Sequence, residues 1–292
     1  MDMKTKNLLT VAASLLFAGC SQNEITEISP DANPAVGDIK GAPKLTFAIE
    51  STGDATKMID FVVAKNDASA TQDRTHANSE SGVAFTFQHV LSRLTFDAKP
   101  SVELSATTST KGTTYVMVKS AKILHGTSSP NFYEKGEFNC SDATWSSKTQ
   151  ATADYDITKV LALSDQKSIV TNTADWTSGK YDAVPLTSTT AVTLFTASEY
   201  LFLIPETAKA GAGTTSAGDV TIQFEYDIVT VDTAVSKGYT ITHHTTDAKL
   251  PKEALKQGTA YKYTVEFGIN EIKILTPTVE NWESGTPGDI TA

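Results

Sequence analysis

The stretch Val220-Thr221-Ile222-Gln223-Phe224-Glu225-Tyr226-Asp227-Ile228 decides the fold class. Large apolar side chains stand at every second position, and mostly polar side chains stand between them. This period-two alternation is typical of a strand with one buried face and one wetted face. Residues 261–267 repeat the pattern with tyrosine, valine and phenylalanine alternating with lysine, threonine and glutamate. Both runs therefore predict half-buried antiparallel β-strands.

Earlier segments carry shorter forms of the same alternation. Leu45, Phe47 and Ile49 would share one strand face, and residues 83–87 form a second run. After Ser92 the apolar parity shifts to even positions, which predicts a bulge or corner near Ser92-Arg93. Little recurs at helical spacing, and no alternation of strands with helices is visible. We therefore expect an all-β protein with two tandem antiparallel β-sandwich domains.

The first residues, 1–19, have the pattern of a lipoprotein signal peptide. Lys4 and Lys6 precede an apolar run at residues 8–18, and small residues lead into Cys20. The run is shorter than the roughly 20 apolar residues that a membrane-spanning helix needs. We therefore expect Cys20 to be the lipidated first residue of an exported protein. An ordinary secretory peptide with a coincidental cysteine is the alternative.

The rest of the chain divides into a tether and two expected domains. Residues 20–42 are rich in proline, aspartate, asparagine and glycine, so they are expected to form a lipidated tether. Domains usually hold about 100–200 residues. We place an N-terminal β-sandwich at residues 43–190 and a C-terminal one at residues 191–292, with the boundary at the end of a weakly patterned, threonine-rich stretch.

The charge balance restricts the possible partners. The chain has 24 basic and 34 acidic residues, a net charge of −10. Such a chain does not attract nucleic acid or an anionic membrane surface, so membrane attachment has to come from acyl chains on Cys20. With Cys20 committed to lipid, Cys140 has no disulfide partner, and we expect it to be a small buried or half-buried residue.

Catalytic motifs are weak in this sequence. No serine-hydrolase elbow, zinc-protease histidine pair or phosphate-binding glycine loop is present. Asp154 and Asp156 could share a strand face as a carboxylate pair, although solvated charges explain them better. Adjacent His243 and His244 would point to opposite faces of a strand, and His89 fits a hydrogen-bonded core histidine. We expect no enzyme, no catalytic residue, no metal and no cofactor.

Several segments, taken in order, resemble the fimbrillin family. They read M-I-D-F-V-V-A-K at residues 58–65, V-A-F-T-F-Q-H-V-L-S-R-L-T-F at residues 83–96, Y-L-F-L-I-P at residues 200–205, and L-K-Q-G at residues 255–258 before the strand at 261–267, with Trp282 beyond. Fimbrillins are lipoprotein precursors of type V pilus subunits, built from two β-sandwiches of transthyretin-like topology. The resemblance implies an outer-membrane, surface-exposed adhesion protein, an expected component of a fimbrium with other fimbrial subunits as partners.

The resemblance also implies assembly by strand exchange. In this family a surface protease cuts after a basic residue and releases an N-terminal strand, and an extended segment of another subunit fills the vacancy. The released strand would here include Leu45, Phe47 and Ile49. Candidate cut sites are Lys57, Arg74 and Lys40, with Lys57 favoured because it follows a turn-like stretch after this strand. The alternative is that none is cut and all three are solvated charges.

The donor side of such an exchange is less distinct. Ile272 and Ile274 alternate with Lys273, but Pro277 interrupts the run and only Ile290 follows as a large apolar anchor. A tip, accessory or anchor subunit is therefore as compatible with the sequence as a stalk subunit.

A non-catalytic glycan-binding surface lipoprotein is the alternative function. Exposed aromatic rings can stack on sugars, and the chain has Trp145, Trp176 and Trp282. Trp282 fits core packing at the end of the chain. Trp145 and Trp176 lie in the weakly patterned, threonine-rich stretch before the expected domain boundary. Under this alternative the partner of the protein would be a host or glycan ligand.

Overall fold

The computed structural model describes residues 44–48, 54–65, 86–104, 113–125, 132–140, 143–170, 179–205, 220–251, 255–280 and 282. Within them the protein consists of β-strands and three short 3-10 helices, η1 (Ala55–Lys57), η3 (Val102–Leu104) and η5 (Thr158–Val160). The predicted all-β class is confirmed. No helix in these ranges has the length and hydropathy needed to cross a bilayer. The predicted signal peptide (1–19) and tether (20–42) lie outside the described residues.

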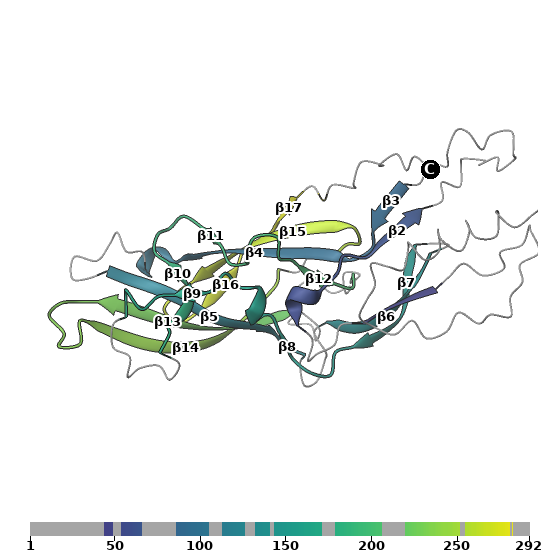
Figure 1. Ribbon diagram of the computed structural model, residues 1–292. Coiled ribbons are helices and arrows are strands. Elements are labelled where there is room, and N and C mark those ends of the chain that lie inside the picture. Colours follow the sequence, from purple (N-terminus) through teal and green to yellow (C-terminus); the bar gives the residue numbers. More distant parts are fainter. Residues whose placement is uncertain are drawn as a thin grey trace, which may run out of the picture.

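The larger part of the molecule is a sandwich of two six-stranded sheets (Figure 1). The first sheet has the order β14-β13-β5-β10-β9, with β8 beside β5: β14 (Tyr239–Lys249), β13 (Thr221–Val231), β5 (Thr113–Ile123), β10 (Asp182–Leu186), β9 (Ser164–Asp165) and β8 (Tyr155–Asp156). The second has the order β11-β4-β15-β16, with β12 beside β4 and β17 beside β15: β11 (Val192–Thr193), β4 (Ser92–Pro100), β15 (Thr259–Phe267), β16 (Ile272–Ile274), β12 (Leu201–Leu203) and β17 (Thr278–Glu280).

The main core lies between these two sheets. Phe224 and Tyr226 of β13 pack edge-to-face on Phe267 of β15, and Tyr263 stacks on Phe96 of β4. All five rings are at most 1% exposed. The alternation in β13 and β15 therefore builds the two facing layers of one core, as the sequence predicted, because successive side chains of a strand point to opposite faces.

The smaller part of the molecule lies at one end of this sandwich (Figure 1). It has a three-stranded sheet in the order β1-β6-β7 and a two-stranded sheet: β1 (Lys44–Ala48), β6 (Tyr133–Asn139), β7 (Thr144–Gln150), β2 (Val62–Lys65) and β3 (Thr86–His89). Its own core consists of buried apolar residues: Val63, Val90, Leu91, Phe138, Phe202 and Ile204.

The corner predicted near Ser92-Arg93 lies at Val90-Leu91. Both side chains are fully buried, which breaks the period-two pattern at this point. The chain leaves the two-stranded sheet at β3 and enters the large sandwich at β4, whose burial alternates regularly from Ser92 onward. The parity shift seen in the sequence is therefore the passage of one segment between two sheets.

Strand pairing differs from the expected arrangement in one respect and crosses the expected domain boundary. β4 and β15 run parallel, from Thr259 opposite Ser92 to Phe267 opposite Pro100, within otherwise antiparallel sheets. β5 and β10, which precede residue 190, share a sheet with β13 and β14, which follow it. The division of the chain at residue 190 stays a prediction that the strand pairing does not support.

Candidate functional site

The first described strand, β1, is the outer strand of the three-stranded sheet. It pairs antiparallel with β6, and Phe47 lies opposite Gly136 in the register. β6 pairs with β7 on its other side, so among the described strands β1 alone covers this edge of β6. The predicted released strand thus includes a real edge strand containing Leu45 and Phe47, whereas Ile49 lies outside the described residues.

Phe47 connects β1 to both cores. Its half-buried ring packs against the apolar cluster of the large sandwich and against that of the smaller part. The ring meets Trp145 of β7 edge-to-face, with 6.3 Å between the ring centroids. Met58, which follows η1, also packs against both clusters. β1 therefore covers apolar surface at the junction of the two parts.

Trp145 is held in place beneath this strand. Its indole N–H donates a 2.9 Å hydrogen bond to the carbonyl oxygen of Val90, and its ring lies 5.3 Å from Phe138. A Cβ atom on Gly136 would lie 3.0 Å from Trp145 Cε3 and 3.3 Å from Ile204 Cδ1. A larger residue at this position would therefore crowd both side chains, so glycine lets the indole ring pack close to the backbone of β6. We call Gly136, Phe138, Trp145 and Ile204 the Phe47 seat.

Lys57 is the exposed last residue of η1, between β1 and Met58. Asp54 caps η1 by accepting hydrogen bonds from the backbone N–H and the hydroxyl of Thr56, and its other carboxylate oxygen lies 2.9 Å from Lys159 Nζ. The hydrogen bond from Lys159 and those from Thr56 lower the pKa of Asp54 to about 2. Ala55 is buried, so η1 is anchored at its start and its lysine side chain projects into solvent.

The other two candidate cut sites, Lys40 and Arg74, lie outside the described residues, as does Cys20. A cut after Lys57 would separate β1 and η1 from Met58. Arg74 follows β2 in the chain, and β2 carries Val63, which is buried in the smaller core. A cut after Arg74 would therefore detach core residues as well as an edge strand.

A second cluster of side chains surrounds Trp282. Its ring stacks on His89 at 4.0 Å between centroids, and the guanidinium of Arg93 lies 5.0 Å from its centre. His89 Nδ1 lies 2.6 Å from Asp60 Oδ2. Burial raises the pKa of Asp60, although the nearby His89 and Arg93 oppose this rise. His89 is half-buried beside Asp60, and Trp282 packs, partly buried, against the smaller core, which agrees with the packing predicted for both residues.

The two tryptophans among the described residues, Trp145 and Trp282, do not favour glycan binding. Trp145 faces Phe47, Phe138 and Gly136, and Trp282 lies between His89 and Arg93, so both rings are engaged by protein groups. Trp176 lies outside the described residues. Glycan binding stays a prediction.

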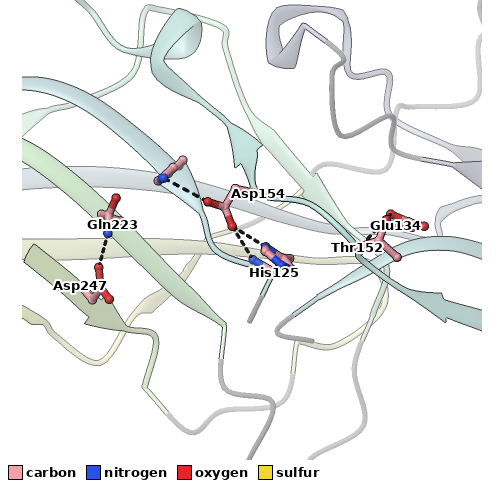
Figure 2. A network of polar contacts seen from close by, with 7 residues as sticks. His125, Glu134, Thr152, Asp154, Gln223 and Asp247 are labelled. Atoms are coloured by element: carbon pink, nitrogen blue, oxygen red, sulfur yellow. Dashed lines mark hydrogen bonds and ion pairs between the residues drawn. The ribbon is translucent and has the colours of Figure 1, made fainter. Parts of the chain in front are cut away.

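Asp154 belongs to a polar network rather than to a carboxylate pair. It accepts hydrogen bonds from the backbone N–H of His125 and lies 2.6 Å from the His125 ring nitrogen and 3.0 Å from Lys122 Nζ (Figure 2). Partial burial would raise the pKa of Asp154, but the hydrogen bonds from His125 and Lys122 outweigh it and lower that pKa to about 2. Asp156 accepts a hydrogen bond from the backbone N–H of Thr158. Asp154 thus links two chain segments, whereas Asp156 makes a local turn contact.

His243 and His244 point to opposite faces of β14, as expected for neighbours on a strand. His243 Nδ1 lies 2.6 Å from Asp227 Oδ1, whereas the ring of His244 stacks on Tyr226. Asp227 was expected on the wetted face of β13, yet it is 1% exposed and also accepts a 2.6 Å hydrogen bond from the hydroxyl of Tyr181. The outer face of this sheet is therefore covered around Asp227, where a separate apolar cluster includes Tyr181 and Val229, whereas Glu225 of the same strand is exposed. The described residues contain no group of three side chains that could hold a metal ion.

The remaining predicted positions are also placed. Cys140 is half-buried against the smaller core, as expected, and burial raises the pKa of its thiol. Ile272 and Ile274 belong to β16, which pairs with β15 of the same chain. Ile290 lies outside the described residues. Sequence reasoning did not identify Gly136, because it stands in no regular apolar alternation, whereas Met58 belongs to the 58–65 segment that resembles the family.

Comparisons with known proteins agree on one family. The fimbrillin-like family model matches residues 29–282. The fimbrium subunit Fim1C of Phocaeicola vulgatus is 31% identical over 253 residues, which are 86% of this chain and 62% of that relative. A solved structure of a fimbrial protein from Bacteroides vulgatus superposes with a TM-score of 0.65 at 25% identity, over 83% of this chain and 69% of the other.

The match therefore extends over most of the described residues, including β1, β6, β7 and Trp282, although the chain spans less than two thirds of the curated relative. On this basis the chain belongs to the fimbrillin-like family.

Proposed function

We propose that this chain is a surface-exposed fimbrial subunit whose β1 strand is released by proteolysis and replaced by a strand of a neighbouring subunit. One observation carries the proposal: β1 is an edge strand whose Phe47 ring closes the junction of both apolar cores. Family membership supports the fimbrial context, and Fim1C is itself described as a fimbrium subunit.

Loss of β1 would create two kinds of unsatisfied surface. The edge of β6 would present unpaired backbone N–H and C=O groups, which are a template for another strand. The Phe47 seat would lose its covering ring at the same time. Burying a large apolar side chain is worth roughly 1.5–3 kcal/mol, so an incoming strand with several such anchors can outweigh the entropy lost on ordering it.

Lys57 is the cut site that the geometry favours. A cut after Lys40 would leave β1 joined to the rest of the chain, and a cut after Arg74 would remove Val63 from the smaller core. A cut after Lys57 removes β1 and η1 and leaves Met58 and β2 in place. Proteases bind extended backbone, so η1 has to unwind before Lys57 can be cut. Because η1 is only three residues long and Lys57 is exposed, this unwinding needs only a local opening of the chain.

Attachment to the outer membrane would come from acyl chains on Cys20, with residues 20–42 as the spacer. In this account the protein has a structural and adhesive role without catalysis, and the released strand takes the lipid anchor with it. Whether the subunit occupies a stalk, tip, accessory or anchor position depends on its own capacity to donate a strand.

The test is the N-terminus of the protein recovered from the cell surface. We expect a mature chain that begins at Met58, and a Lys57→Gln variant that retains lipidated Cys20 at its N-terminus. Lys159→Gln is the matched control, because it removes a nearby lysine, the η5 residue that pairs with Asp54, without removing the cut site. A wild-type surface chain that begins at lipidated Cys20 would overturn strand release.

A further inference from the structure

Resting on the strand replacement proposed above, we propose that the Phe47 seat selects an aromatic side chain in whichever strand pairs with β6. The ligand is an extended peptide segment with phenylalanine or another aromatic residue opposite Gly136. The selectivity resides in this one register position rather than in the length of the strand.

The register fixes which side chain enters the seat. Residues directly opposite one another in an antiparallel pair lie on the same face, and Phe47 is opposite Gly136. Gly136 has no side chain, and the ring of Trp145 lies in the space that a side chain there would take. A side chain at position 47 therefore faces Trp145, and the Phe47 ring meets it with its plane at 80° to that of the indole. Edge-to-face contact of this kind is favourable for aromatic pairs and is absent for aliphatic side chains.

The walls of the seat are held in place by their own contacts. Trp145 is tied to the Val90 carbonyl by its N–H, and Phe138 is fully buried. The ring of Trp145 is also packed close to Gly136. A small side chain opposite Gly136 would therefore leave an unfilled cavity instead of a repacked contact. A ring also reaches both cores, as Phe47 does.

The experiment uses the full chain with a site-specific protease sequence inserted between Ala48 and Asp54. After cleavage, a labelled peptide with the sequence of residues 44–50 competes with the retained β1 strand, and fluorescence anisotropy reports its binding. Competitor peptides carry Phe47→Trp, Phe47→Leu or Phe47→Ala. Thr46→Ala is the matched control, because Thr46 is exposed on the other face of the strand. The protein is identical in every arm, so its folding does not confound the comparison.

We expect the Phe47→Ala peptide to bind about 30-fold or more weakly than the native sequence, with Phe47→Leu between them and Thr46→Ala within about two-fold of native. Equal binding of the native and Phe47→Ala peptides would overturn the aromatic selectivity while leaving strand replacement intact. Failure of every peptide to displace β1 would overturn strand replacement itself, and the aromatic selectivity with it.

Discussion

Replacing Phe47 by alanine in the intact chain should loosen β1 without unfolding the molecule. Removing a fully buried phenylalanine ring costs about 3–5 kcal/mol, and Phe47 is half-buried, so we expect about 2 kcal/mol. Since 1.4 kcal/mol corresponds to a factor of ten, the population with β1 detached should rise about 30-fold. Only the contacts of one edge strand are lost, so the large sandwich should keep its stability.

Hydrogen exchange under native conditions measures this directly. Peptides that cover β6 should exchange about 30-fold faster in Phe47→Ala than in the wild type, because β1 shields that edge of β6. Peptides that cover β13, at the centre of the large sandwich, should be unchanged. Thr46→Ala on the exposed face is the control. Equal protection of β6 in both variants, or an equal loss in β13, would refute the idea that Phe47 holds a separable strand.

Three further predictions concern the scaffold. Tyr181→Phe should lower the free energy of unfolding in urea by about 1.5–3 kcal/mol, because it removes a hydrogen bond to the buried Asp227 carboxylate; wild-type stability would contradict this. Asp154→Asn should cost about 1 kcal/mol at neutral pH after allowance for solvent screening. Because the pKa of Asp154 is lowered from 3.8 to about 2, its stabilisation is present above pH 4 and lost as the pH falls toward 2, so the difference from wild type should vanish there; a constant difference would disprove the assignment. Gly258→Ala should lower the melting temperature and cost about 1–3 kcal/mol, since φ is +64° and the added Cβ would lie 3.0 Å from a backbone oxygen; an unchanged melting temperature would count against it.

The alternation of apolar and polar residues was enough to predict those features of the fold that depend on a single strand. The alternation at residues 220–228 and 261–267 predicted which side chains of β13 and β15 enter the core, and the parity shift near Ser92 located a corner. Each of these depends on side chains pointing to alternate faces, which a single segment reveals without its partners.

Features set by distant partners were not visible in the sequence. The parallel pairing of β4 with β15 joins segments more than 150 residues apart, and no local pattern encodes it. Asp227 looked solvated because its strand alternates, yet Tyr181 and the outer cover of the sheet bury it. Gly136 lies in a poorly alternating strand, and its role depends on Trp145.

The candidate site was predicted in outline only. The resemblance of residues 58–65 and 83–96 to fimbrillins directed attention to the strand before Lys57, and the structure places that strand at a sheet edge. The seat that receives Phe47 could not be predicted, because its residues come from β6, β7 and the segment after β12, which meet only in the folded protein.

The central claim is that β1 occupies a place that another strand can take. Sedimentation velocity with a labelled peptide of residues 44–50, comparing the full-length chain with a chain that begins at Met58, tests it most directly. The account predicts that the peptide co-sediments with the shorter chain and not with the full-length chain, in which β1 already occupies the place. Failure of the peptide to co-sediment with the shorter chain would contradict it.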